Sequence, residues 1–359
     1  MRCQTHLREA VHEKVYQEFV YCHDYRARYR EECVPGSRRR RRRRAQVLAF
    51  FASLPSCLVG IEACSSAHHW ARALIAMDHR VKLMPPAYVK PYVRRSKNDP
   101  VDAEAICEAV GRPNMRFVAV REVENQAALM HHRTRELLAG NRMRMLNALR
   151  GHLAEVGVVA PQGAQHAYAL KRLLTAGHDD SGEIVVPDSV CKALAPLAQQ
   201  IDSIDEEIAA IDDQIKARVK ADDTARRLAT IPSIGPITAS ALVATVRDPS
   251  AFASGREFAA FIGLTPRQNS SGGKERLGSI TKMGDRYLRK LLVVGACAAL
   301  VHRKGHNDAL RVWADQLMAR KPAAYKFKLT AVAFANKVAR IVFALMTRGG
   351  EYVERPVAA

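Results

Sequence analysis

Three carboxylates in the first third of the chain have the residue types and spacing of a divalent metal site. Glu62 lies near the end of the apolar segment 57–64, which is typical of a buried strand, and a carboxylate there needs a partner to offset its desolvation. Asp99 and Asp102 begin a predicted helix three positions apart, so both lie on one side of its first turn. Such oxygen ligands suit Mg²⁺ or Mn²⁺ rather than zinc, and two such ions activate a hydroxyl for attack on phosphate.

The two aspartates also allow a purely structural interpretation. Asp99 as the N-cap, Pro100 at the first helical position and Asp102 in the first turn make a favourable helix start without any metal. Taken alone, the pair favours capping. The addition of Glu62 shifts the balance toward a metal site.

A Gly- and Ser-rich segment, 266–276, could supply a nucleophile. Its serines, Ser270 and Ser271, have neighbouring cations that would stabilise a serine alkoxide and the charged transition state of phosphoryl transfer. These cations are Arg267, Lys274 and Arg276. The composition is equally typical of a phosphate-contacting loop and of a flexible one.

The segment 231–240, flanked by helical sequence, predicts a helix-hairpin-helix motif. Gly235 is expected to permit a tight turn. Backbone N–H groups at the start of the following helix, around Thr238, are expected to hold a DNA phosphate without reading bases. The alternative is an ordinary turn between two helices.

The elements that must position these residues follow from the hydrophobic pattern. From Ala45 onward, helix and strand alternate, which predicts an α/β domain. The expected helices are 46–51, 67–77 and 101–110, and the expected strands are 57–63, 81–84 and 116–120. Beyond residue 122 the pattern is helical almost to the C-terminus, which adds an all-α part to the fold.

A sustained heptad seam marks the middle of this helical part. Apolar residues recur at alternating steps of three and four, which predicts a coiled coil, antiparallel or intermolecular. The seam consists of Leu194, Leu197, Ile201, Ile204, Ile208, Ile211 and Ile215. We expect a homo-oligomer through this segment. In a monomer the seam would instead pack within the chain, against the helical segment 126–156.

The charge balance indicates a phosphate-rich partner. Among 359 residues, Lys and Arg outnumber Asp and Glu by 56 to 36, a net charge of +20, which favours nucleic acid. The sequence has no signal-peptide pattern and no long uncharged apolar run, which predicts a cytoplasmic protein without a membrane span. The eight cysteines form no C-x-x-C pair, so neither a zinc site nor a disulfide framework is indicated.

Several of these segments, in their order along the chain, resemble transposases of the insertion sequence 110 family and its 1111 subgroup. The resemblance covers roughly residues 45–352. It rests on Gly60-Ile-Glu-Ala-Cys64, Ala67-His-His-Trp-Ala-Arg72, the segment from Lys97 to Ala109, and the segments 229–239, 261–274 and 283–289.

The resemblance implies a ribonuclease H-like catalytic domain with four acidic residues, a coiled-coil segment and a C-terminal domain that supplies a catalytic serine. Glu62, Asp99 and Asp102 match the second, third and fourth acids. The serine corresponds to Ser271, with Ser270 as the second choice. The resemblance also implies DNA as substrate and a guide RNA as partner, with sequence choice assigned to the RNA.

The N-terminus departs from the family pattern. The first acid of the family follows an early Val-Gly-Ile strand that this chain lacks; Glu13 and Asp24 are poor substitutes in spacing or context. The first residues carry an arginine run, Arg38 to Arg44, and no clear periodicity. This run is typical of a solvated basic arm or of a phosphate clamp. Our hypothesis is that the segment comes from a shifted reading frame or an altered start.

These observations predict four regions: an atypical basic segment 1–44, a ribonuclease H-like domain 45–121, a helical and coiled-coil region 122–221, and a C-terminal helical domain 222–350 with the helix-hairpin-helix motif. The predicted function is a metal-dependent, RNA-guided DNA transposase with a serine nucleophile. One alternative is a catalytically inactive relic that binds DNA or RNA. Another is a junction-cleaving nuclease, which would share the acids but not need the serine.

Overall fold

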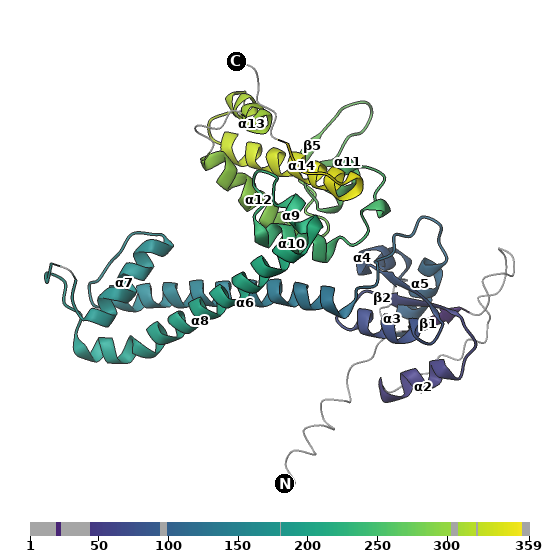
Figure 1. Cartoon of the computed structure of the whole chain (residues 1–359), viewed down its shortest axis with the longest axis horizontal. Helices are drawn as coiled ribbons and strands as arrows, with labels where there is room; N and C mark the ends of the chain where they lie inside the picture. The colour runs from purple at the N-terminus through teal and green to yellow at the C-terminus, as the bar shows by residue number, and fades with distance from the viewer. Residues whose placement is uncertain are drawn as a thin grey trace, which may run out of the picture. The chain divides into compact units, whose positions relative to one another are not determined.

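The computed structural model describes residues 19–22, 44–93, 99–179, 181–302, 308–320 and 322–353. It divides the chain into two compact units, Met1–Val123 and Glu124–Ala359 (Figure 1). Glu13, Asp24 and the arginines Arg38 to Arg43 lie outside the described residues.

The first unit is built on a three-stranded sheet in the order β1-β2-β3. Strand β2 (Leu58–Glu62) is central. It pairs in parallel with β3 (Arg80–Met84), with Glu62 opposite Met84, and antiparallel with β1 (Phe19–Cys22). The β1 strand has no counterpart among the elements predicted from sequence.

Side chains of β2 alternate between the two faces of the sheet, as the pleat requires. Val59 and Ile61 pack into a cluster with α2 (Val47–Ala52) and α3 (Ala67–Ile75). Leu58 joins a second cluster, with α4 (Pro86–Val89) and α5 (Asp99–Val110). A short 3₁₀ turn, η2 (Lys90–Tyr92), lies between α4 and α5, and another, η1 (Arg44–Gln46), precedes α2.

The predicted alternation of helix and strand is present, with one exception. The expected strand 116–120 is wrong. In its place the structure has a single bridge, in which the Val118 N–H donates to the Leu83 carbonyl at 2.8 Å. A single bridged pair does not make a strand, but it holds this segment beside β3.

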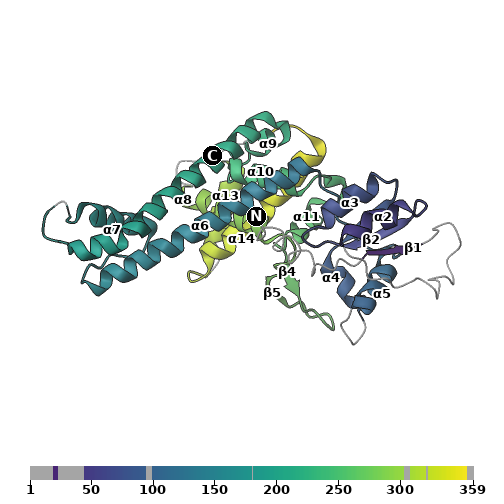
Figure 2. The same ribbon diagram turned by 90° about the horizontal axis from the view of Figure 1, so that it is seen from below.

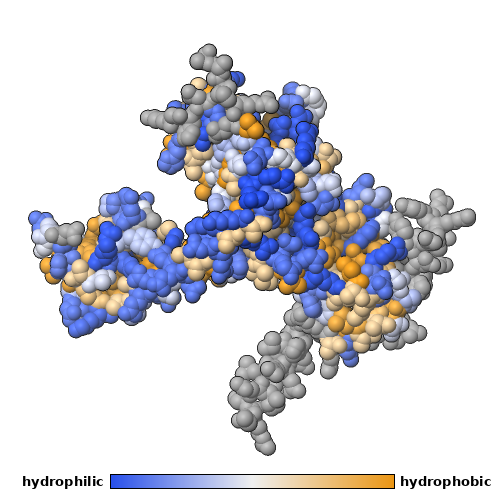
Figure 3. Space-filling view, viewed as in Figure 1, coloured by the Kyte–Doolittle hydropathy of each residue, from blue (hydrophilic) through white to orange (hydrophobic). Residues whose placement is uncertain are grey.

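The second unit contains two long helices, α6 (Val123–Glu155) and α8 (Asp188–Ala221), which lie side by side and antiparallel (Figures 1 and 2). Arg142 donates to Asp205 at 2.8 Å. About two turns earlier on α6, Arg135 donates to Asp212. At the far end the two helices share an apolar cluster that includes Leu146, Leu149, Leu153, Leu194, Ala198 and Ile201. The face of this pair that Figure 3 shows is largely hydrophilic.

The heptad seam of α8 is therefore covered within the chain. Its isoleucines from Ile201 to Ile215 are each at most 8% exposed. Burial by α6, α7 and the C-terminal helices satisfies the seam, so the expected homo-oligomer is not needed to explain it.

Because the antiparallel register is held by charged pairs across the two helices, a double-mutant cycle will detect it. We expect Arg142→Ala and Asp205→Ala to show a coupling energy of about 1 kcal/mol in urea unfolding. The matched control is Lys216–Asp213, an exposed pair within α8, where the coupling should be about 0.3 kcal/mol or less. Equal coupling in the two cycles would contradict the α6–α8 register.

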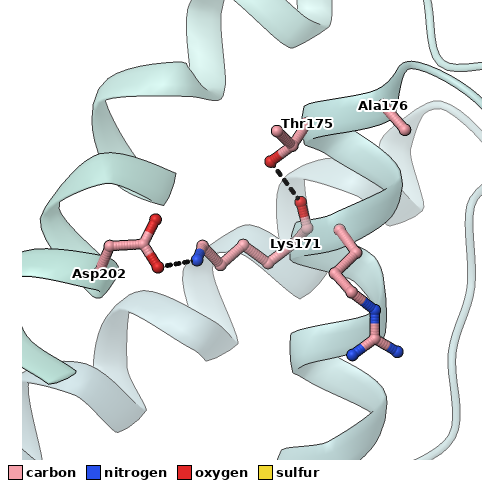
Figure 4. Close-up of a pocket in the computed structure, with 5 residues that line it drawn as sticks. Lys171, Thr175, Ala176 and Asp202 are labelled. Atoms are coloured by element: carbon pink, nitrogen blue, oxygen red, sulfur yellow. Dashed lines mark hydrogen bonds and ion pairs between the residues drawn. The ribbon is translucent and has the colours of Figure 1, made fainter.

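A shorter helix, α7 (Ala164–Ala176), packs against the far part of α8. Lys171 forms an ion pair with Asp202 across a shallow depression between the helices (Figure 4). The Thr175 hydroxyl donates to the Lys171 carbonyl at 3.0 Å. The hydroxyl of Tyr168 donates to Asp205 at 2.7 Å, so α7 also touches the charged pair with Arg142. These contacts fold α7 back on the long helices.

The rest of the second unit is helical, with one hairpin. Its helices are α9 (Asp223–Leu228), α10 (Pro236–Thr245), η3 (Pro249–Ala251), α11 (Gly255–Phe261), α12 (Arg286–Val301), α13 (Ala309–Ala319) and α14 (Lys326–Arg348). Asp222, Ser254, Asp285 and Asp308 cap α9, α11, α12 and α13 with side-chain acceptors, which is why these helices begin where they do.

Helix α14 lies at the centre of this core. Its length and apolar composition would allow a membrane span, but Phe334, Val338 and Val342 are fully buried against the neighbouring helices. Lys337 and Arg340 interrupt its apolar sequence. The apolar character of α14 is therefore explained by its place in the core.

Candidate functional site

Glu62 lies at the end of β2, on the face that α5 covers. A Cβ atom placed on Gly60 would lie 3.2 Å from both Ile106 and Val110, so α5 crosses the strand directly at Gly60. Glu62 is two residues further along, and alternate residues of a strand share a face. The carboxylate is therefore presented on the α5 side of the sheet.

Asp102 shares a helix face with the contact point on α5. It precedes Ile106 by four residues, which places the two side chains one turn apart on one side of the helix. Ile106 is fully buried, whereas Asp102 is half-buried. Glu62 and Asp102 thus belong to a strand and a helix that pack against each other at Gly60. Asp99 is the first residue of α5, and its side chain is outside the described part of the chain.

The two described carboxylates of the predicted metal site, Glu62 and Asp102, are free of protein partners within the described part of the chain. Glu62 is half-buried, and the side chains of Glu62 and Asp102 form no hydrogen bond or ion pair within the described part of the chain. No three His, Cys, Asp or Glu side chains gather closely enough to hold a metal ion among the residues whose side chains are described.

The serine segment is a β-hairpin rather than a flexible loop. Strands β4 (Pro266–Gln268) and β5 (Leu277–Ile280) pair antiparallel, and the pairing continues to a bridge between Ser271 and Lys274. Gly272 and Gly273 form the turn with φ of 57° and 74°. Two consecutive positive φ angles define a type I′ turn, the tight connection that matches strand twist and favours glycine.

The hairpin distinguishes the two serines. The Ser270 hydroxyl accepts a hydrogen bond from the Arg276 N–H at 3.1 Å, so it is occupied within the hairpin. Ser271 sits beside the turn opposite Lys274, and residues opposite each other in a ladder share a face. Its hydroxyl has no hydrogen bond among the described residues, and the residue is exposed. Arg267 and Arg276 are exposed on the same hairpin.

The predicted helix-hairpin-helix segment forms a turn between α9 and α10, but not for the expected reason. The left-handed residue is Ser233, with φ of 80°, whereas Gly235 has φ of −87° and is the N-cap of α10. A Cβ atom on Gly295 would lie 2.2 Å from the Ser233 carbonyl, so α12 packs tightly on the turn. Gly235 is exposed, whereas Thr238 is only 6% exposed. The accessible groups at this helix start are therefore those of the backbone rather than the Thr238 side chain.

A buried polar cluster in the second unit was not predicted from sequence. His132 of α6 is 1% exposed, with Nε2 3.1 Å from the Ser240 hydroxyl and Nδ1 3.3 Å from the Tyr287 hydroxyl. Burial, aided by the charge of Arg135, lowers the pKa of His132 to about 4. Burial raises the pKa of Tyr287 to about 12. The one sign of this cluster in the sequence is that His132 falls on the otherwise apolar buried face of α6.

Two family models match the chain. A transposase model of the DEDD type for IS110 matches residues 27–158, and the model described as Transposase IS116/IS110/IS902 family matches residues 225–311. The first match covers the carboxylate region and begins within the segment that we considered atypical. The second covers the Ser233 turn and the serine hairpin.

Full-length relatives agree with these matches. A "Probable family 20 transposase" of Pseudomonas aeruginosa is 44% identical over 86% of this chain and 90% of its own length. The transposase for insertion sequence element IS1328 of Yersinia enterocolitica is 38% identical over 87% of this chain and 90% of its own. That for element IS1111A of Coxiella burnetii is 38% identical over 87% and 84%. The chain therefore belongs to the IS110/IS1111 family of insertion sequence transposases.

Proposed function

We propose that this transposase cuts and joins DNA with two groups of residues: a metal-binding carboxylate edge in the first unit and a nucleophilic serine on the hairpin of the second. The observation that carries the proposal is the half-buried residue Glu62 at the end of β2, whose side chain has no partner among the described residues, beside the helix that carries Asp102. Such a carboxylate needs a counter-charge to offset its desolvation.

A divalent ion fits this donor set. Glu62, Asp99 and Asp102 offer only carboxylate oxygens, which suit Mg²⁺ or Mn²⁺. These residues would hold the ion on a ribonuclease H-like domain, where it would supply charge neutralisation at a phosphate. Carboxylates placed on a strand end and a packed helix hold their positions through the buried core beneath them.

Ser271 is the proposed nucleophile. Its Oγ forms a bond to phosphorus as the bond from phosphorus to the sugar oxygen breaks, and the serine proton ends on the released sugar hydroxyl. The phosphodiester is conserved as a serine–DNA linkage, which a second DNA end can attack in reverse. Lys274 lies on the same hairpin face and, with Arg276 and Arg267, can stabilise the additional negative charge of the transition state.

DNA and RNA contacts complete the proposal. The net charge of +20 favours binding to both nucleic acids, with a guide RNA selecting the target. The exposed backbone at Gly235 and the first turn of α10 near Thr238 would hold a DNA phosphate as a helix-hairpin-helix motif does. We also propose that α6 and α8 act as an intramolecular coiled coil that separates the two functional regions along the chain.

The proposal is tested by strand exchange with purified protein, DNA carrying the element ends, RNA from the non-coding end of the element, and Mg²⁺. We expect recombinant product that disappears with EDTA. Asp102→Asn should lower the rate by about 10²-fold or more, because the loss of a carboxylate ligand weakens the hold on the ion that would neutralise charge at the phosphate. Glu108→Gln, an exposed carboxylate on the same helix paired with Arg112, is the matched control and should retain activity.

A second candidate function is an inactive relic that only binds nucleic acid. It is favoured by the sequence, which lacks the early Val-Gly-Ile strand and the first acid that follows it in the family pattern. In that case the wild-type protein would bind DNA and RNA but form no recombinant product at any Mg²⁺ or Mn²⁺ concentration. Product from the wild-type protein would exclude this function.

A further inference from the structure

The serine hairpin leaves the helical core through a neck, which we define as residues 261–265 and 281–284. Two backbone hydrogen bonds join its sides: the Thr281 N–H donates to the Thr265 carbonyl at 2.8 Å, and the Lys282 N–H to the Gly263 carbonyl at 3.2 Å. Beyond the neck, residues 266–279 are all exposed. The direction of the hairpin must therefore be set at the neck.

The two sides of the neck meet backbone against backbone. A Cβ atom on Gly284 would lie 1.8 Å from the Phe261 carbonyl oxygen, and one on Gly263 would lie 2.3 Å from the Met283 carbonyl oxygen. Both glycines have positive φ, 71° and 79°. Only glycine allows this approach, so the neck has little freedom to accommodate a shift.

One side chain ties this neck to the core. Nη1 of Arg289 donates to the carbonyl of Ile262 on one side and to that of Met283 on the other, both at 2.8 Å. Arg289 belongs to α12, whose Leu288 and Leu292 are fully buried, so its backbone is fixed. Hydrogen bonds from a guanidinium are charge-assisted and stronger than neutral ones.

A weaker contact supports the same region from another helix. The side-chain amide of Asn336, on α14, donates to the Leu264 carbonyl at 3.2 Å. Asn336 donates to one side of the neck only, whereas Arg289 donates to both.

We infer that Arg289 is a positioning residue for the transposition reaction, because it fixes the direction in which the hairpin presents Ser271. The inference rests on the proposed role of Ser271. A misplacement of a reacting group by about 1 Å costs about 10²-fold in rate. Losing both hydrogen bonds should therefore slow the formation of the serine–DNA linkage without weakening the binding of DNA.

The experiment compares Arg289→Met, which removes both donors but keeps an apolar stem, with Arg289→Lys, which keeps a cation with several donors. Arg286→Met is the matched control, since Arg286 is an exposed arginine on the first turn of the same helix. For each full-length protein, three quantities are measured: the rate of covalent protein–DNA formation, the dissociation constant for DNA, and the amide hydrogen exchange of peptides that cover the neck and α14.

We expect Arg289→Met to slow adduct formation by about 10²-fold, with an unchanged dissociation constant and faster exchange at Thr281 and Lys282 but not in α14. Arg289→Lys should recover most of the rate. Unchanged exchange at the neck in Arg289→Met, or a loss of rate equalled by Arg286→Met, would overturn the inference. Absence of any adduct in the wild-type protein would instead overturn the proposed role of Ser271, and neck exchange alone would then decide whether Arg289 orients the hairpin.

Discussion

Ser271→Ala will lower the rate of DNA joining by about 10³-fold or more and abolish the covalent protein–DNA species, since removal of a nucleophile leaves only binding and charge stabilisation. The assay is denaturing gel electrophoresis of labelled DNA ends incubated with protein, guide RNA and Mg²⁺. Binding of DNA should be unchanged, because Lys274, Arg267 and Arg276 all remain.

Ser270→Ala is the matched control for that experiment. The Ser270 hydroxyl accepts a hydrogen bond from the Arg276 N–H inside the hairpin, and its loss should affect the stability of the turn more than the chemistry. Joining that survives Ser271→Ala would refute the assignment of the nucleophile. If Ser270→Ala alone abolished joining, the role would belong to Ser270. Nicked DNA without any covalent species would indicate a nuclease.

The second large effect concerns stability at acidic pH. The pKa of His132 falls from 6.5 to about 4 in the folded state, chiefly through burial and then through Arg135, His131 and Arg218. The unfolded chain therefore binds a proton at His132 more readily than the folded chain. The stability contributed by neutral His132 is fully present above pH 6.5 and is lost as the pH falls from about 6.5 to about 4, by about 3 kcal/mol in all.

Urea unfolding between pH 7.5 and 4.5 measures this dependence. His132→Phe should lower the free energy of unfolding at pH 7.5, because the Ser240 hydroxyl loses its buried partner, by about 1–3 kcal/mol. It should also remove most of the decline toward pH 4.5. His152→Gln, at an exposed position on α6, is the control and should keep the decline. An equally steep decline in His132→Phe would show that another group controls the acid sensitivity.

Much of the first unit was predictable because its signals are local. The apolar run around Gly60 and the alternation of helix and strand place Glu62 on a buried strand and Asp102 on the next long helix, as expected. Periodicity also predicted α8 and its buried seam. The relatives confirm the family that the motifs indicated.

The sequence pattern could not show which surface covers each of these elements. The same heptad seam can pack against a helix of another chain or against a helix of the same chain. The position of α6 in the fold shows that it packs within the chain. The positive φ angle of the turn lies at Ser233 rather than at Gly235, at a point where α12 packs closely through Gly295. A Ser-Gly-Gly-Lys segment is compatible with a loop or a hairpin, and cross-strand pairing decided for the hairpin.

The sequence by itself thus determined the family, the types of residue available for chemistry and most helices and strands, because these depend on neighbours along the chain. Three features were decided by the tertiary structure alone. The Ser270 hydroxyl accepts a hydrogen bond within the hairpin, while Ser271 lies opposite Lys274. His132 is buried between two hydroxyls, and Arg289 donates hydrogen bonds to both sides of the neck. The contacts of His132 and the contact from Arg289 to Ile262 join residues far apart in sequence, and the hairpin contacts depend on how two strands pair. In each case burial and hydrogen-bond geometry, rather than residue type, set the outcome.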